Sequence, residues 1–424
     1  MSCSLIENVY ETSLHYASPA HGGWGVLKIA QLIPDSYFLF VSPAACGRHG
    51  ALGARMEGRK NRVSYLFLTE QSIVSGDYEK MLIDALDQLM DFLKKRNRLP
   101  KVMGIFVSCI DDLLGTDHEA LKAQLEERYS GIRFIDCHMN PTSSDTGVPP
   151  LVNIQNKIYS VLERTDRTDD AVNIVGNLEP VHKESELTEV LEKMGVKEVR
   201  HITDYKTYED YQDMAASRLN IRLAPSVKYA CTNMQRKLGI PSVEALISFR
   251  PENIRKNYEA IAEGLNVKCP DLSEYEQEAL KALLETKKEL GDMPLILDWE
   301  CTISVFEFAR CLLEHGFNVK RIYSQQVIPS DKENFEWVME NYPDVEIRQP
   351  QNPKVTVEEH VDYECIAVGY SAGYLSGAEH VVDIGGQHGL YGYRGLVEFL
   401  KKIKETKHEK ADLKKILEDA VLII

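Results

Sequence analysis

Short apolar runs alternate with segments of helical composition along most of the chain. In the first third, apolar runs typical of buried strands occupy residues 37–41, 63–68, 102–107 and 132–135. Later runs of the same kind occupy residues 171–175, 294–298, 319–323, 365–368 and 381–384. Segments of helical composition lie between these runs, at residues 119–128, 252–288 and 303–314. Because strands that alternate with helices form parallel sheets, the pattern predicts an α/β fold.

Polar stretches divide this pattern into three sequential units. A proline-bearing stretch at residues 138–150 ends the strands of the first unit, and residues 165–170 have the composition of a linker. New strands begin the second unit at residue 171 and the third at residue 294. We predict domains at residues 1–165, 166–290 and 291–424, each built on a parallel sheet. The second should end in a helical connector, and the third in an amphipathic helix over residues 403–424.

Composition narrows the class of protein. The nine cysteines are scattered without a disulfide-like framework, which favours a reducing compartment. The first residues lack the basic region and apolar core of a secretory signal, and no apolar run approaches the ~18 residues of a membrane helix. A net charge of -16 disfavours nucleic-acid binding, which needs a basic surface. We therefore expect a cytoplasmic protein that binds neither membrane nor nucleic acid.

Two cysteines directly follow predicted strands. Cys46, flanked by alanine and glycine, follows the strand at 37–41, and Cys109 follows the strand at 102–107. The carboxyl ends of parallel strands meet at one edge of a sheet, where ligands bind. Two thiols at that edge could hold one metal or iron–sulfur centre, because soft thiolates suit such metals. Two free cysteines that pack as small hydrophobic residues are the alternative, and spacing alone favours it.

Further motifs accompany these cysteines in order along the chain. They are HGGWG at residues 21–25, LGTD at 114–117 and GQHGLYGYRG at 386–395. The ordered set resembles the nitrogenase component 1 family, in which a glycine-flanked cysteine follows an early strand and a second cysteine lies in a Ser/Thr-Cys segment. That family includes dark-operative protochlorophyllide reductases and cofactor-assembly scaffolds. The resemblance implies three Rossmann-like units, with the cluster cysteines in the first.

The resemblance also implies an iron–sulfur cluster of the four-iron type (4Fe–4S), held through Cys46 and Cys109. Electron-transferring members usually have a third cysteine before the Trp-Gly stretch, whereas residues 14–19 contain none here. Cys3 or His15 is a candidate for a further ligand, and a partner chain is another source. Two copies of the chain, or one copy with a related nitrogenase-like subunit, would supply four thiols. We therefore expect a homodimer or such a pairing.

An activity follows from the same resemblance. A separate iron protein, an ATP-dependent reductase, would deliver low-potential electrons, and this chain would use them to reduce an unidentified substrate. The sequence has no Gly-Lys-Ser/Thr phosphate loop, so no nucleotide is expected on this chain. Residues 219–225 lack the cysteine that binds the molybdenum cofactor of nitrogenase, so dinitrogen is not the expected substrate. A metallocluster scaffold or carrier without turnover is the alternative.

A second candidate site lies in the sequence DWECT at residues 298–302, which ends a strand and precedes a helix. Loops of this kind bind ligands in α/β sheets. We predict that Glu300 and Cys301, with Trp24, contact a cofactor or substrate. The helix N-terminus, with Thr302 as its cap, should lower the pKa of the Cys301 thiol. A capped loop with a partly buried thiol is the alternative.

Three residues near the C-terminus are predicted to act catalytically at this crevice. His388 and Arg394 lie in the motif at 386–395, and His380 lies where the resemblance would place a cofactor histidine. Histidine suits reductions that consume protons, because it exchanges protons near neutral pH. The sequence GYSAG at 369–373 also fits the nucleophile elbow of a hydrolase. That alternative is weaker, because its acid and histidine would both crowd into the last part of the chain.

Other cysteines have simpler interpretations. A zinc site at Cys46 and His49 with Cys137 and His138 is not favoured, because only one paired C-x-x-H unit occurs. Cys137 is expected to pack at the end of its strand. The remaining cysteines of the later units are expected in the core, at Cys231, Cys269, Cys311 and Cys365.

Overall fold

The computed structural model describes residues 25–44, 46–47, 50, 54–55, 58–138, 148–357, 360–385 and 388–419. Its strands form three parallel sheets, which confirms the predicted fold class of Rossmann-like units. The first sheet has the order β2-β1-β3-β4. Its strands are β1 (Ser36–Ser42), β2 (Val63–Phe67), β3 (Val102–Val107) and β4 (Arg133–His138). All are within a few residues of the apolar runs in the sequence.

Helices cover both faces of this first sheet. They are α2 (Gly25–Ala30), α4 (Glu70–Val74), α5 (Tyr78–Lys94), α6 (Cys109–Leu114), α7 (His118–Arg128) and α8 (Pro150–Ser160). Every residue of β1 and β3 is buried, as expected of central parallel strands. Alternate residues serve different cores: Leu39 packs with Leu82 of α5, whereas Phe40 packs with Ile154 of α8.

The second sheet has the order β6-β5-β7-β8. Its strands are β5 (Ala171–Val175), β6 (Glu198–Arg200), β7 (Leu219–Arg222) and β8 (Ser242–Glu244). Its helices are α9 (Leu187–Lys193), α10 (Tyr208–Tyr211), α11 (Lys228–Leu238) and α12 (Pro251–Gly264), and α13 (Ser273–Leu290) leads to the third sheet. The predicted helical connector is interrupted between α12 and α13, around Cys269.

The third sheet has the order β11-β10-β9-β12-β13. Its strands are β9 (Pro294–Asp298), β10 (Asn318–Tyr323), β11 (Glu346–Arg348), β12 (Ile366–Val368) and β13 (His380–Val382). Its helices are α14 (Val305–Glu314), α15 (Lys332–Asn341), α16 (Tyr370–Ser376), α17 (Gly392–Thr406) and α18 (Leu413–Asp419). Short 3-10 helices complete the described elements: η1 (Lys60–Arg62), η3 (Ile202–Asp204), η4 (Gln212–Ala216), η5 (Pro225–Val227), η6 (Pro329–Asp331) and η7 (Pro353–Thr356).

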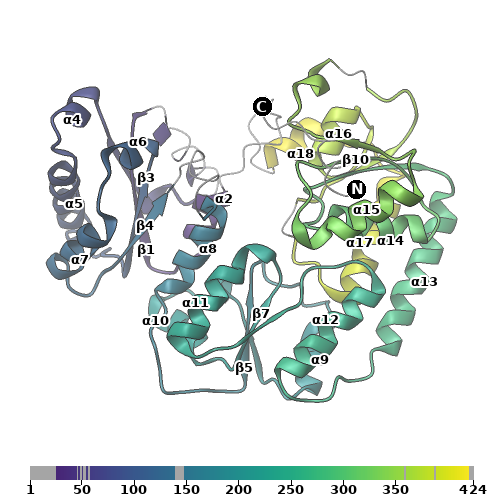
Figure 1. Cartoon of the computed structure of the whole chain (residues 1–424), viewed down its shortest axis with the longest axis horizontal. Coiled ribbons are helices and arrows are strands. Elements are labelled where there is room, and N and C mark those ends of the chain that lie inside the picture. The colour runs from purple at the N-terminus through teal and green to yellow at the C-terminus, as the bar shows by residue number, and fades with distance from the viewer. Residues whose placement is uncertain are drawn as a thin grey trace.

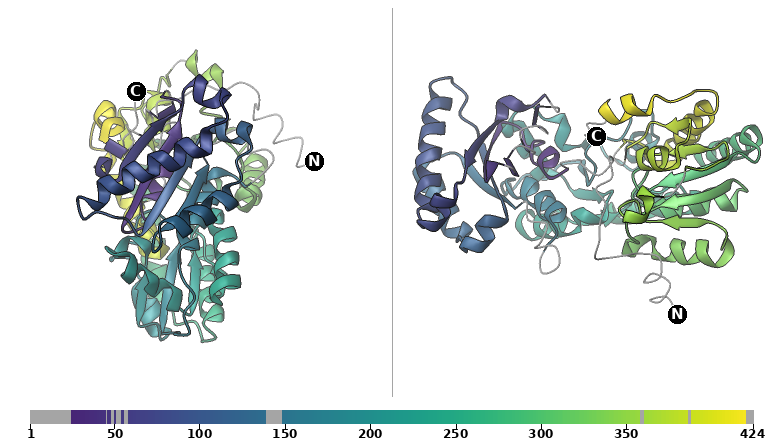
Figure 2. Two further views of the ribbon diagram at one scale, coloured as in Figure 1. Left: turned by 90° about the vertical axis from the view of Figure 1, so that its left-hand side faces the viewer. Right: turned by 90° about the horizontal axis from the view of Figure 1, so that it is seen from above.

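The second unit lies between the first and the third and packs on both (Figure 1). One hydrophobic core continues from β5 of the second unit to α17 of the third, and another joins α8 of the first unit to α11 of the second. Seen from above, the first and third units occupy opposite ends of the molecule (Figure 2).

The C-terminal helices of the third unit differ from the prediction. The predicted single helix over residues 403–424 is wrong, because α17 ends at Thr406 and a separate helix, α18, begins at Leu413. Hydrogen bonds from the amide of Ala411 to the carbonyl of Glu379, and from His380 to the carbonyl of Glu409, hold the intervening turn against β13.

Among the helices that the structure describes, none combines the length and apolar character that a membrane crossing requires.

Candidate functional site

The loops that carry Cys46 and Cys109 lie at one edge of the first sheet. Strands β1 and β3 are parallel neighbours, and Val41 pairs with Val107 near their carboxyl ends. Cys46 follows β1 in a short helical stretch and is partly buried, while Cys109 is the first residue of α6 and is exposed. The structure thus brings both thiol-bearing loops to the edge where the sequence placed them. Metal binding by these thiols stays a prediction.

Two serines beside these cysteines have free hydrogen-bonding capacity. Ser42 ends β1 and Ser108 precedes Cys109, and both side chains are buried. Neither hydroxyl has a hydrogen-bond partner within the described part of the chain. Buried hydroxyls normally find partners, so a polar or ionic group at this edge would satisfy them. Two thiols flanked by such hydroxyls fit a sulfide-containing cluster, whose sulfurs accept hydrogen bonds.

Steric crowding explains why a glycine, Gly47, follows Cys46. A Cβ atom on Gly47 would lie 2.8 Å from a ring carbon of Phe67 and 3.2 Å from Oγ of Ser42. Any larger residue would push this loop away from the strand ends. Cys3 and His15, the candidates for a further ligand of this site, lie outside the described residues, as does Trp24, which was predicted at the second candidate site.

The second candidate site is built around the Asp298 carboxylate at the end of β9. This carboxylate is fully buried and accepts hydrogen bonds from the amides of Glu300 at 2.8 Å, Cys301 at 3.2 Å and Ala372 at 2.7 Å. Glycine is required at position 369, which faces the Asp298 carboxylate. A Cβ atom on Gly369 would lie 2.1 Å from Oδ1 of Asp298, and the φ angle of Gly369 is +107°. The interaction joins the loop after β9 to the start of α16.

This arrangement explains the GYSAG sequence without hydrolysis. Its first glycine allows close approach to Asp298, and its Ser371 is only 1% exposed. A nucleophile elbow presents its serine to substrate, whereas this side chain is enclosed in the packing of α16. The geometry therefore supports the interpretation of Ser371 as a packing residue.

Burial controls the protonation of the acids in this loop. Burial raises the pKa of Asp298, although the backbone amides that bind it act in the opposite direction. Burial and then the neighbouring Asp298 raise the pKa of Glu300. Oε2 of Glu300 is buried and has no hydrogen-bond partner among the described residues. Glu300 is therefore favoured in its protonated form near neutral pH, which makes it a candidate proton donor.

The expected activation of Cys301 is wrong. The thiol is completely buried, and burial, followed by the charge of Asp298, raises its pKa well above the ordinary value. Helix α14 begins only at Val305, with Ser304 rather than Thr302 at the N-cap position. The helix terminus is thus too far along the chain to offset desolvation of the thiol. Cys301 contributes its backbone here, not a reactive thiolate.

His388 is the predicted catalytic residue that does reach this loop. Its Nε2 atom donates a hydrogen bond to the carbonyl of Cys301 at 2.8 Å, so Nδ1 carries the lone pair. Nδ1 is buried and unpartnered among the described residues. Burial lowers the pKa of His388, which favours the neutral imidazole. The same loop contacts the second unit, where the amide of His182 donates to the carbonyl of Gly389 at 2.8 Å.

His380 and Arg394 lie elsewhere. His380 is the first residue of β13, at the amino end of the strand, and its Nδ1 donates to the carbonyls of Thr406 at 3.1 Å and Glu409 at 2.6 Å. Asp298 ends β9, so the two residues are at opposite edges of the sheet. The Arg394 guanidinium lies 3.4 Å from Glu189, on the surface formed by α9 and α13. Of the three predicted catalytic residues, the structure brings His388 alone to the Asp298 loop.

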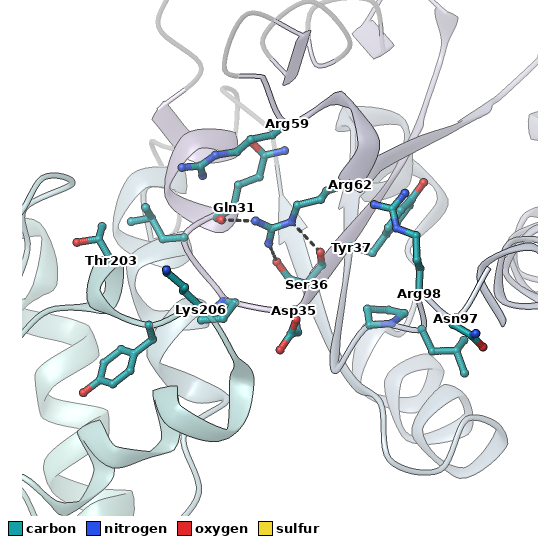
Figure 3. Close-up of a pocket in the computed structure, with 15 residues that line it drawn as sticks. Gln31, Asp35, Ser36, Tyr37, Arg59, Arg62, Asn97, Arg98, Thr203 and Lys206 are labelled. Atoms are coloured by element: carbon teal, nitrogen blue, oxygen red, sulfur yellow. Dashed lines mark hydrogen bonds between the residues drawn. The ribbon is translucent and has the colours of Figure 1, made fainter.

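A pocket that the sequence analysis missed lies between the first and second units. Its volume is about 550 Å³, and its lining includes Arg59, Arg62, Arg98 and Lys206 (Figure 3). Arg62 is held by the carbonyls of Ile33 at 2.6 Å, Ser36 at 3.0 Å and Gln31 at 3.1 Å. Burial lowers its pKa to about 10. The pocket is at the amino end of β1, opposite the edge that carries the cysteines.

A family model described as nitrogenase component 1 type oxidoreductase matches residues 22–407. The nitrogenase iron–molybdenum cofactor biosynthesis protein NifE of Clostridium pasteurianum is 27% identical over 241 residues, which are 55% of this chain and 50% of the relative. The match thus spans about half the length of that relative.

Two solved structures are similar over nearly the whole chain. Nitrogenase Cp1 at pH 6.5 has a TM-score of 0.71 and 13% sequence identity, and the match covers 93% of each chain. Nitrogenase Cp1 at pH 5 has a TM-score of 0.61 and 18% identity, with 94% of this chain and 90% of the other covered. At such identities the likeness establishes the fold.

Proposed function

We infer the function of this chain from its family, since it belongs to the nitrogenase component 1 type oxidoreductases. We propose that it is an iron–sulfur subunit of a nitrogenase-like oxidoreductase, with a four-iron cluster (4Fe–4S) held through Cys46 and Cys109. One observation carries the proposal: both thiols follow adjacent parallel strands, at an edge where the buried hydroxyls of Ser42 and Ser108 lack hydrogen-bond partners among the described residues. When bound, such a cluster would accept and release single electrons at low potential.

The proposed electron donor is a separate iron protein that hydrolyses ATP. ATP would bind the iron protein and not this chain. This chain would contribute the thiols and a site for an unidentified substrate other than dinitrogen. We place that substrate site at the Asp298–Cys301 loop. Glu300 would supply a proton to it, and the neutral His388 would hold the loop through the Cys301 carbonyl. Both assignments rest on burial, which favours the protonated acid and the uncharged imidazole.

A scaffold function is the second candidate. The relative from Clostridium pasteurianum is a cofactor biosynthesis protein, which favours a chain that carries a metallocluster and passes it on. A scaffold needs cluster ligands but no proton donor, so the two candidates differ at Glu300. If Glu300→Gln abolishes reduction of a substrate while cluster content is unchanged, the chain is a reductase. If cluster transfer to a partner is the only measurable activity, it is a scaffold.

The proposal is tested first by cluster content. The full-length chain, purified anaerobically, should contain iron and acid-labile sulfide, with an electron paramagnetic resonance signal that changes on reduction with dithionite. Cys46→Ala and Cys109→Ala should each lose most of this iron, because thiolates dominate the affinity of such sites. Cys231→Ala and Cys269→Ala, which change cysteines distant from the sheet edge, should retain it. Full iron occupancy in both strand-end variants would refute the proposal.

We further propose a cytoplasmic location.

A further inference from the structure

A second group of metal-ligand side chains gathers in the first unit. Asp111 lies on α6, His118 is the first residue of α7, and His138 ends β4. One ligand atom from each lies within 4.8 Å of the other two. These residues come from three elements and are brought together where α7 packs against β4.

The contacts within this Asp–His–His group are close. The Asp111 side chain is 1% exposed, and its Oδ2 accepts a hydrogen bond from Nε2 of His118. The rings of His118 and His138 stand edge to face, with centroids 4.7 Å apart. The hydroxyls of Tyr78 and Thr116 lie near the carboxylate, but neither is aligned as a hydrogen bond to Oδ1. That buried oxygen is therefore available to another electrophilic group.

A supporting carboxylate stands behind His138. Oδ2 of Asp136 lies 3.2 Å from Nε2 of His138, and the ammonium of Lys157 lies 2.6 Å from the other oxygen of Asp136. Metal-binding histidines commonly have one ring nitrogen held by a carboxylate, which orients the other toward the metal. Lys157 balances the charge of Asp136, so that carboxylate need not bind the cation itself.

We propose that Asp111, His118 and His138 form a binding site for a divalent transition-metal ion, for which Zn²⁺ is the probe. Two imidazoles and a carboxylate are a ligand set of such ions, with a fourth position left for water. Ligand atoms around a tetrahedral zinc lie about 3.4 Å apart. Binding therefore requires the hydrogen-bonded atoms of Asp111 and His118 to separate, and any wider spacing in the group, at most 4.8 Å, to shorten. The ion would fasten the α6–α7 turn, and with it Cys109, to β4.

The ligand atoms of this site differ in kind from those at the sheet edge that carries Cys46 and Cys109. Cys137 is adjacent to His138 in sequence, but successive residues of a strand face opposite sides, and the Cys137 thiol is buried with a raised pKa. A zinc site at Asp111, His118 and His138 would have nitrogen and oxygen ligands only. It does not rest on the proposed iron–sulfur function, since its residues are different.

The test uses the full-length chain, freed of metal and titrated with Zn²⁺ against a chromogenic chelator. We expect one tight zinc per chain, with affinity at least 100-fold lower in His138→Ala and His118→Gln. His118→Gln can still hydrogen-bond to Asp111, so it separates metal binding from structural support. His408→Ala, which alters an exposed histidine beside Glu289, is the matched control and should bind as the wild type does.

Cobalt provides the second measurement. Co²⁺ in the wild-type chain should show ligand-field bands without a thiolate charge-transfer band, and these bands should vanish in His138→Ala. Iron content, measured before the metal is removed, should be equal in all four proteins, which keeps this test separate from that of the cluster. The proposal is overturned if His118→Gln and His138→Ala bind Zn²⁺ as tightly as the wild type. It is equally overturned if the sole cobalt spectrum is that of a thiolate site.

Discussion

The Glu186 carboxylate of the second unit accepts a 2.7 Å hydrogen bond from the amide of Tyr393, at the start of α17 in the third unit. It also accepts from the amide of Arg394 at 3.0 Å and from the hydroxyl of Tyr258 at 2.8 Å. The side chain is completely buried. One carboxylate thus satisfies the free amides at a helix start and joins two units of the chain.

Glu186→Ala should therefore destabilise the protein strongly. It leaves two buried amides and a tyrosine hydroxyl without their partner, and a loss of about 3 kcal/mol is expected. Urea unfolding of the full chain, followed by circular dichroism, measures the effect. Glu184→Ala removes an exposed glutamate from the same loop and should change stability by less than about 0.5 kcal/mol. Equal stability of the two variants would contradict the role given to Glu186.

Gly369→Ala should disturb the loop at Asp298. The new methyl group would collide with the Asp298 carboxylate, and the positive φ adds backbone strain, so we expect a cost of about 3 kcal/mol. Gly195→Ala is the control, because Gly195 also has a positive φ but no atom within 4 Å of the added Cβ. It should cost only about 1 kcal/mol. The difference between the urea midpoints of the two variants measures the cost of the steric collision with Asp298.

Glu300 should make stability depend on pH. Its pKa is raised in the folded chain, so above the ordinary value of 4.5 the unfolded chain releases a proton that the folded chain retains. Stability therefore falls as pH rises beyond that value. Glu300→Gln cannot ionise, so its free energy of unfolding relative to wild type should increase between pH 6 and pH 8.5, by an amount on the order of 1–3 kcal/mol. The melting temperatures of the two proteins should diverge in the same direction.

An exposed acid provides the control for that measurement. Glu263→Gln should shift the melting temperature by the same small amount at both pH values, since Glu263 is exposed in the folded chain. Identical pH profiles of Glu300→Gln and wild type would show that Glu300 ionises normally, and the proton-donor assignment would fail.

Assembly should depend on the cluster. The described part of one chain offers Cys46 and Cys109 at the sheet edge, whereas a four-iron cluster usually takes four protein ligands. We expect a dimer, or a pairing with a related subunit, that weakens when the cluster is removed, because a ligand of the assembled state stabilises it by mass action. Anaerobic analytical ultracentrifugation measures this. A cluster-loaded monomer would instead implicate Cys3 or His15.

Much of the fold was predictable because strand patterns are local. Apolar runs of a few residues located all four strands of the first sheet, including β3 at 102–107, and all but one strand of the third, including β9 at 294–298, but only β5 of the second. The convergence of the Cys46 and Cys109 loops also followed, since parallel strands must present their carboxyl ends at the same edge. The strands β6, β7, β8 and β11 were missed, because they are only three or four residues long and their sequences mix polar with apolar residues.

Protonation states and groupings of side chains were decided by tertiary structure. The sequence placed Cys301 near a helix start and so suggested a reactive thiol, whereas its enclosure by distant elements makes it inert. It also grouped His380 with His388, although strand direction separates them. His118 and His138 become neighbours only when β3 and β4 pair and α7 folds back over them. The sequence by itself determined the alternation of strands and helices, most strands of the first and third units and the edge on which the thiols lie, because these depend on local periodicity and chain direction. Burial and contacts between remote residues depend on how the units pack, and so only the tertiary structure decided them.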